Sequence, residues 1–77
     1  MISLSMIKQG ESARIIRYKS HPPHAHQLQS LGLVPGTVVS IHRVAPLGDP
    51  IHLKLRDYDL CLRRDDLECI SVAQITR

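Results

Sequence analysis

The sequence contains no tryptophan and no phenylalanine, and only two tyrosines, Tyr18 and Tyr58. Domains that bind proline-rich peptides line their grooves with aromatic side chains, and surfaces for single-stranded nucleic acids stack bases on them. The cationic residues are also interleaved with acidic ones, as in the run Arg-Arg-Asp-Asp at residues 63–66. We therefore expect neither an SH3-type peptide-binding groove nor a nucleic-acid interface.

Motifs for catalysis and for structural metal sites are also missing. The four glycines are scattered and none precedes a Lys-Ser or Lys-Thr pair, so the chain has no phosphate-binding loop. Ser40 and Ser71 fall in predicted strands rather than at a nucleophile elbow. Cys61 and Cys69 lack the C-x-x-C spacing of zinc sites, and we assign them structural roles. These absences predict that the protein is not an enzyme.

Asp, Glu, Lys and Arg are absent from position 20 to position 42, a span long enough to cross a bilayer. Prolines, glycines and histidines interrupt this span, which excludes a membrane helix. Residues 1–7 are too short for a signal peptide, and no small-residue cleavage site follows them. We expect a cytoplasmic protein that does not itself insert into the membrane and whose two thiols stay reduced.

The sequence is short and rich in aliphatic residues. Leucine, isoleucine and valine supply most of the 43% hydrophobic content of its 77 residues, which favours β-strands. A chain of this length forms one domain with a thin core and has little volume for a deep substrate pocket. We treat residues 1–77 as a single domain and expect residues 1–3 and 73–77 to fray. The net charge of +3 permits an acidic partner without requiring one.

Hydrophobic periodicity predicts about five strands and one helix. The strands are expected at residues 11–18, 37–44, 51–56, 60–63 and 68–72. Pro22 and Pro23 suit the first turn of a helix over residues 24–31, which Gly32 ends. Single helical turns are expected at residues 4–7 and 64–67, and a hairpin turn at residues 57–59. Because closure removes exposed strand edges, the pattern predicts a mainly β fold, a small SH3-like five-stranded barrel with one short inserted helix.

Three sequence blocks occur in a fixed order. They are Leu-Gly-Leu-Val-Pro-Gly at residues 31–36, Ala-Pro-Leu-Gly-Asp-Pro at residues 45–50 and Leu-Cys-Leu-Arg-Arg at residues 60–64. Together they resemble the FeoA family of bacterial ferrous iron uptake, and the resemblance covers roughly residues 4–72. It implies an SH3-like barrel with a helical insertion and a role beside FeoB, a large membrane iron permease whose cytoplasmic part carries a GTP-binding domain. The family has no established catalytic residues, so the resemblance implies none here.

On this basis we predict a small cytoplasmic accessory protein of bacterial ferrous iron uptake. It would bind and modulate a FeoB-type permease at the inner face of the membrane, and self-association stays open. The prolines of loop 45–50 would limit the entropy lost on docking, and the helix offers an apolar pair that either faces outward or packs on the barrel. The candidate partner-binding residues are Leu28, Leu31, Pro46, Leu47, Gly48, Asp49 and Pro50.

The alternative hypothesis is a transition-metal-binding or metal-sensing SH3-like module, since the same barrel type forms the C-terminal domain of repressors of the diphtheria-toxin repressor kind. The sequence His-x-x-His-x-His places His21, His24 and His26 close together, and imidazole suits several transition metals. On a regular helix, however, His24 and His26 would point about 160 to 200 degrees apart, and we expect no carboxylate nearby to orient an imidazole. We therefore predict no required cofactor and keep these three histidines as weak metal candidates.

Overall fold

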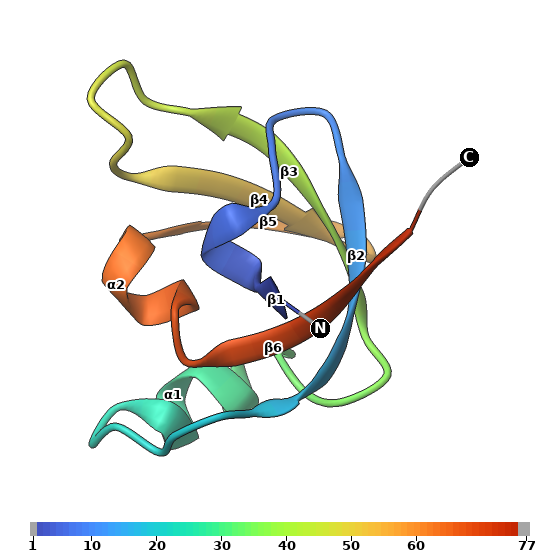
Figure 1. The fold of residues 1–77 in the computed structure, drawn as a ribbon, viewed down its shortest axis with the longest axis vertical. Helices are drawn as coiled ribbons and strands as arrows, with labels where there is room; N and C mark the ends of the chain where they lie inside the picture. The colour runs from blue at the N-terminus through green and yellow to red at the C-terminus, as the bar shows by residue number, and fades with distance from the viewer. Residues whose placement is uncertain (1, 76–77) are drawn as a thin grey trace.

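The computed structural model describes residues 2–75, and its strands form one antiparallel sheet in the order β1-β6-β2-β3-β4-β5 (Figure 1). The strands are β1 (Ile2–Ser3), β2 (Ser12–Tyr18), β3 (Val38–Val44), β4 (Ile51–Leu55), β5 (Tyr58–Leu62) and β6 (Ile70–Ile75). The helices are the 3-10 helix η1 (Leu4–Met6), α1 (Ala25–Ser30) and α2 (Arg64–Leu67). The sheet curls around an aliphatic core, which confirms the predicted mainly β architecture.

The strand count exceeds the prediction by one, because the chain ends are paired rather than frayed. Ile2 and Ser3 pair with Val72 and Ser71, and β6 continues to Ile75, which pairs with Ser12 of β2. The expectation of fraying at residues 1–3 and 73–77 is therefore wrong for residues 2–3 and 73–75, whose backbone groups find partners on strands distant in sequence. Residues 1, 76 and 77 lie outside the described residues.

The hairpin between β4 and β5 is tighter than predicted. Leu55 pairs directly with Tyr58, so the loop consists of Arg56 and Asp57 alone, and Tyr58 and Asp59 belong to β5. The aromatic Tyr58 suits a strand position better than a turn position. Its hydroxyl donates a hydrogen bond to the carbonyl of Leu31 and so ties β5 to the end of α1.

Buried aliphatic side chains show which face of β4 and of α1 packs on the core. Side chains on β4 alternate as predicted, with Leu53 and Leu55 fully buried and Lys54 exposed between them. Helix α1 docks on the barrel through Ala25 and Leu28, which are both buried. The fully buried large side chains are Leu4, Ile15, Leu33, Ile41, Ile51, Leu53, Leu55, Leu67, Ile70, Val39 and Val72.

Tyr18 closes the core beside α1. Its hydroxyl donates a hydrogen bond of 2.7 Å to the carbonyl of Leu33, in the segment that joins α1 to β3. Burial, and to a lesser extent the neighbouring Cys69 thiol, raises the pKa of Tyr18 to about 12. The phenol therefore stays neutral at physiological pH and acts as a hydrogen-bond donor.

Candidate functional site

The loop between β3 and β4, residues 45–50, projects from one end of the molecule (Figure 1). Leu47 stands at its tip with 97% of its surface exposed. The loop nevertheless has a defined backbone. The Gly48 N–H donates to the Ala45 carbonyl at 2.8 Å, and the Ala45 N–H donates to the Pro50 carbonyl at 3.1 Å. Gly48 has a φ of 90°, a left-handed value that glycine adopts without steric cost.

Arg64, the first residue of α2, fixes this loop to the body of the protein. Its backbone N–H donates to Asp49 Oδ1 at 2.6 Å, and its Nε–H donates to the Gly48 carbonyl at 3.3 Å. A further guanidinium N–H donates to the carbonyl of Ser5 in η1. A single side chain thus joins the loop, α2 and η1, which gives a physical reason for the Arg-Arg block to accompany the Ala-Pro-Leu-Gly-Asp-Pro block. The sequence did not reveal this contact.

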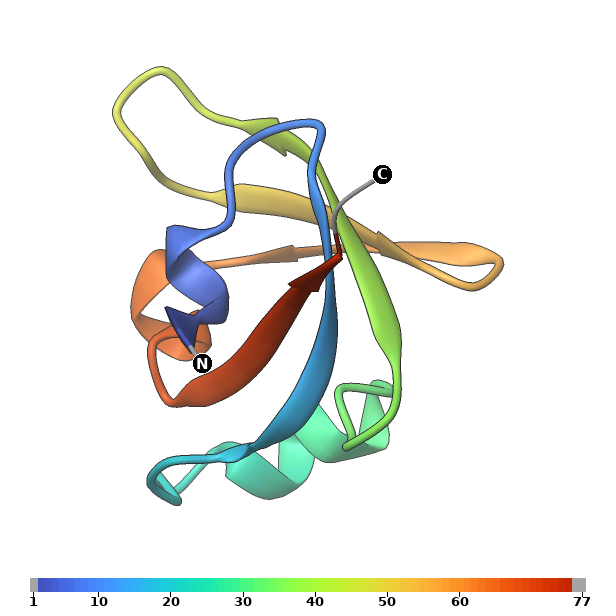
Figure 2. The same cartoon turned by 45° about the vertical axis from the view of Figure 1, so that its right-hand side comes forward.

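The seven candidate contact residues do not form one surface. Pro46, Leu47 and Pro50 are exposed on the loop, whereas α1 lies at the opposite end of the molecule (Figures 1 and 2). Leu28 is 3% exposed and belongs to the core, so it is removed from the candidate set. Leu31 remains 37% exposed. The helix therefore packs inward, and the loop is the stronger candidate for a partner contact.

Gly48 and Asp49 contribute to the loop in a different way from the apolar tip. The Gly48 carbonyl and the Asp49 carboxylate both accept hydrogen bonds from Arg64. Their role is therefore to hold the loop in shape. Asp49 is also exposed, as are Pro46, Leu47 and Pro50, and the contact of these residues with a partner stays a prediction.

The three histidines before and within α1 do not converge. His21 stacks on the ring of Tyr18, with ring centroids 6.2 Å apart, and His26 is exposed on α1. His24 directs its Nε2 to within 2.8 Å of Asp66 Oδ1 on α2, close enough for an ion pair when the imidazole is protonated. The expectation that no carboxylate approaches these histidines is therefore wrong for His24, because the fold brings α2 against the start of α1.

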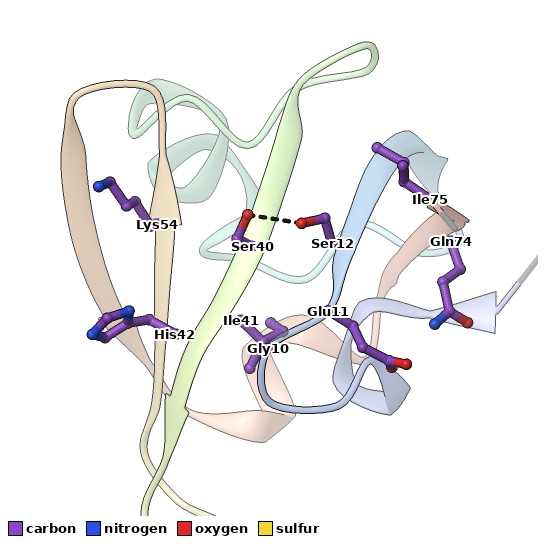
Figure 3. A pocket seen from close by; sticks show the side chains of 9 residues that line it. All are labelled: Gly10, Glu11, Ser12, Ser40, Ile41, His42, Lys54, Gln74 and Ile75. Carbon is purple, nitrogen blue, oxygen red and sulfur yellow. Dashed lines mark hydrogen bonds between the residues drawn. The ribbon is translucent and has the colours of Figure 1, made fainter. Parts of the chain in front are cut away.

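A second surface feature is an open groove of about 600 Å³ that is lined by residues of β2, β3, β4 and β6 and of the turn before β2 (Figure 3). In its lining the hydroxyls of Ser12 and Ser40 lie 2.9 Å apart and hydrogen-bond to each other. Glu11, His42 and Lys54 also line it. Because the two hydroxyls pair with one another rather than with a base, the groove presents no activated nucleophile among the residues drawn.

Both cysteines are free thiols in the structure. Cys61 faces outward on β5. Cys69 is buried, and its thiol donates to the Asp66 carbonyl at 3.4 Å. Burial raises the pKa of Cys69, and this keeps it in the unreactive thiol form. Over residues 2–75, the structure contains no helix of the length and apolarity that crossing a membrane requires.

Comparison with known proteins connects this geometry to a family. The family model of the FeoA domain matches residues 2–74. A fusion of Fe(2+) transport protein A with the Fe(2+) transporter FeoB, from Porphyromonas gingivalis strain ATCC BAA-308 / W83, is 32% identical over 73 residues. That match covers 95% of this chain but only 9% of the fusion protein.

Solved structures agree in fold. The FeoA-like protein of Clostridium acetobutylicum superposes with a TM-score of 0.90 at 30% identity, over 99% of this chain and 88% of its own. FeoA of Stenotrophomonas maltophilia, described as a prokaryotic SH3 domain protein, gives a TM-score of 0.81 at 22% identity, over 95% and 91% of the two chains. With a domain model matched along nearly its whole length, this chain belongs to the FeoA family of ferrous iron transport proteins.

Proposed function

We propose that this protein is an accessory subunit of bacterial ferrous iron uptake that binds the cytoplasmic region of a FeoB-type permease and modulates it. The observation that carries the proposal is the fully exposed Leu47 at the tip of a loop that Arg64 holds in place. The fusion in Porphyromonas gingivalis supports the choice of partner, because it joins a FeoA relative to FeoB in one polypeptide. Fusion of this kind raises the effective concentration of two domains that act together.

The energetics favour such a loop as a docking element. Burying a fully exposed leucine contributes about 1.5–3 kcal/mol, provided that ordering the loop does not consume the gain. The hydrogen bonds from Arg64 and within residues 45–50 order the loop before any partner arrives. Pro46 and Pro50 further limit its conformational freedom. The loop therefore presents its apolar tip at a small additional entropic cost.

Modulation requires more than binding. A partner shifts the equilibrium of a permease only if it binds one state of that permease better than another. The GTP-bound and GDP-bound states of the permease's nucleotide-binding domain are the natural pair to discriminate. The protein itself offers no group for nucleotide chemistry, so its effect on transport would be exerted through differential affinity.

Calorimetric titration against the cytoplasmic region of the permease, with GDP and with a GTP analogue, tests the proposal. We expect binding that depends on the nucleotide and that Leu47→Asp weakens at least tenfold. The matched control is Val34→Asp, which places the same charge at another partly exposed apolar position, outside the loop. Failure to bind in every nucleotide state, with full-length permease also tried, contradicts the proposal. Equal binding by the native protein and Leu47→Asp excludes the loop as the contact.

A further inference from the structure

The strand β5 (Tyr58–Leu62) is an edge of the sheet with a strand partner on one side only. Among residues 2–75 it pairs with β4 and with no other strand. Figure 2 shows the β4–β5 hairpin, in yellow and orange, projecting beyond the body of the barrel. Proteins commonly protect an edge strand with proline, lysine or a bulge, and β5 has none of these. This edge is therefore open to pairing with another strand.

Two residues of β5 direct their backbone groups away from β4. Leu55 and Tyr58 close a two-residue hairpin loop, so they exchange hydrogen bonds with each other. Bonded and non-bonded residues alternate along an antiparallel strand, and Asp59 and Cys61 therefore point their N–H and carbonyl groups at the open edge. Both residues are exposed. No loop, turn or cap hydrogen bond within residues 2–75 uses these four backbone groups.

We propose that two copies of this chain pair through β5, antiparallel about a twofold axis, to form a weak homodimer. The axis passes at Leu60, so that Asp59 of each copy lies opposite Cys61 of the other. Each such pair exchanges two hydrogen bonds, which satisfies every free backbone group of both strands. Because both copies contribute the same surface, the assembly closes after one addition and leaves neither β5 edge open.

The charges at the two ends of β5 complement each other in this register. Arg63 continues β5 with extended backbone, φ −77° and ψ 150°. With the axis at Leu60, Arg63 lies opposite Asp57 of the second copy, and the symmetry repeats this pair at the other end. Both side chains are exposed. Opposite charges on facing strands attract, so two ion pairs flank the four central hydrogen bonds.

Neighbouring registers are less favourable. Only a shift of the axis to Asp59 or to Cys61 would also place free backbone groups opposite one another. An axis at Asp59 sets two carboxylates face to face, which is destabilising. An axis at Cys61 places Asp59 opposite Arg63, whose carbonyl accepts a hydrogen bond from the Asp66 N–H and whose N–H donates to the Asp66 carboxylate. The register centred on Leu60 is therefore the one that the chain favours.

The inner face of β5 adds an apolar contact. Tyr58, which is 43% exposed, lies opposite the partly exposed Leu62 of the second copy, as an aromatic–aliphatic pair. A contact confined to five-residue strands is small, and interfaces of this kind are typical of weak, transient complexes. We expect the dimer to form as the concentration rises from micromolar to millimolar. It does not rest on permease binding, and the isolated protein is sufficient to test it.

Sedimentation equilibrium of the isolated protein over that concentration range, with reductant present, tests the dimer. Cys61→Pro removes an N–H that bonds across the axis, and an edge strand tolerates proline at such a position. We expect this variant to dimerise at least tenfold more weakly than the native protein, with an unchanged circular dichroism spectrum. The matched control Cys61→Ser keeps the N–H and should dimerise like the native protein. A monomer at every concentration, or equal dimerisation by Cys61→Pro, overturns the proposal.

Charge exchange tests the register. Arg63→Asp and Asp57→Arg should each weaken the dimer by about tenfold, because each turns two attractive pairs into repulsive ones. The double variant Arg63→Asp/Asp57→Arg restores both pairs and should recover native dimerisation. A double variant as weak as the single ones contradicts the register.

Disulfide trapping gives a second readout. Asp59→Cys places a thiol opposite Cys61 of the second copy, at a Cα separation of about 5.5 Å that a disulfide can span. Mild oxidation should convert this variant to a covalent dimer on a non-reducing gel. Lys54→Cys, at an exposed position on β4, is the matched control and should remain mostly monomeric. Equal cross-linking of the two variants would place the contact elsewhere and overturn the proposal.

Discussion

The two ends of this molecule differ in what they do with apolar side chains. At the α1 end, Leu28 is turned into the core and histidines and glutamines cover the outside. At the loop end, Leu47 is held in solvent by a hydrogen-bonded frame that Arg64 anchors. One segment uses its leucine for stability, and the other keeps its leucine available. An exposed apolar side chain on a hydrogen-bonded loop is therefore the better candidate for partner binding.

Replacing the two leucines should have its largest effect on the stability of the fold. Leu28→Ala should lower the free energy of unfolding by about 2–5 kcal/mol, because it removes buried side-chain volume from a thin core. Leu47→Ala should change it by no more than about 0.5 kcal/mol, because Leu47 has no buried contacts to lose. Urea unfolding followed by circular dichroism measures both. Equal destabilisation by the two variants would remove the distinction between the two ends.

Substitutions at two glycines that follow α1 test how closely Tyr58 packs on the end of that helix. Gly32 has a φ of 104°, and a Cβ there would collide with the Tyr58 hydroxyl and press on Leu55. Gly36 has a φ of 94° but open space around it. We expect Gly36→Ala to cost about 1–2 kcal/mol from backbone strain alone and Gly32→Ala to cost more. Thermal unfolding of both variants provides the comparison. A smaller effect at Gly32 would mean that the Tyr58 contact does not constrain the turn.

Removal of the Arg64 side chain should loosen the loop at residues 45–50. Arg64→Ala should reduce stability by about 1 kcal/mol and increase amide exchange at Gly48, because the guanidinium hydrogen bonds to the Gly48 and Ser5 carbonyls are lost, although the backbone bond to Asp49 remains. Arg17→Ala, at an exposed arginine on β2, is the matched control and should leave Gly48 exchange unchanged. Hydrogen exchange followed by NMR measures the effect. Unaltered exchange in Arg64→Ala would show that the loop is ordered without its anchor.

A last effect concerns Tyr18 and appears only at alkaline pH, so it is absent under physiological conditions. The folded-state pKa of about 12 lies above the usual value of 10.0, so the protein favours the neutral phenol. This contribution to stability is complete below pH 10 and is lost as the pH rises toward 12. Absorbance of tyrosinate in a Tyr58→Phe background, in which Tyr18 is the sole tyrosine, should show its titration delayed to that range. An ordinary midpoint near 10 would place the phenol in solvent.

Local pattern was enough to predict much of the fold. Alternation identified β4 and its inward face, and Pro22-Pro23 followed by Gly32 bracketed α1 to within a residue at each end. The pattern failed where pairing between distant segments decides the outcome. The two-residue strand β1 is a strand only because it pairs with Ser71 and Val72 of β6. The end of β6, residues 73–75, is a strand only because it pairs with β2.

The candidate site was less accessible from sequence for the same reason. Loop 45–50 was identified from its prolines, but Arg64 could be recognised as its anchor only once α2 was placed beside it. The contacts of His24 with Asp66 and of His52 with Asp59 also depend on which elements become neighbours. Sequence patterns described each element separately, whereas these contacts arise only from the packing of one element against another.

The most direct test of the account is site-specific photo-crosslinking in cells that express the permease. A benzoylphenylalanine placed at position 47 should cross-link to the cytoplasmic region of the FeoB-type permease, whereas the same probe at position 34 should not. Cross-linking from position 34 and none from position 47, or capture of the permease from neither, would contradict the claim that the rigid loop is the surface this protein offers its partner.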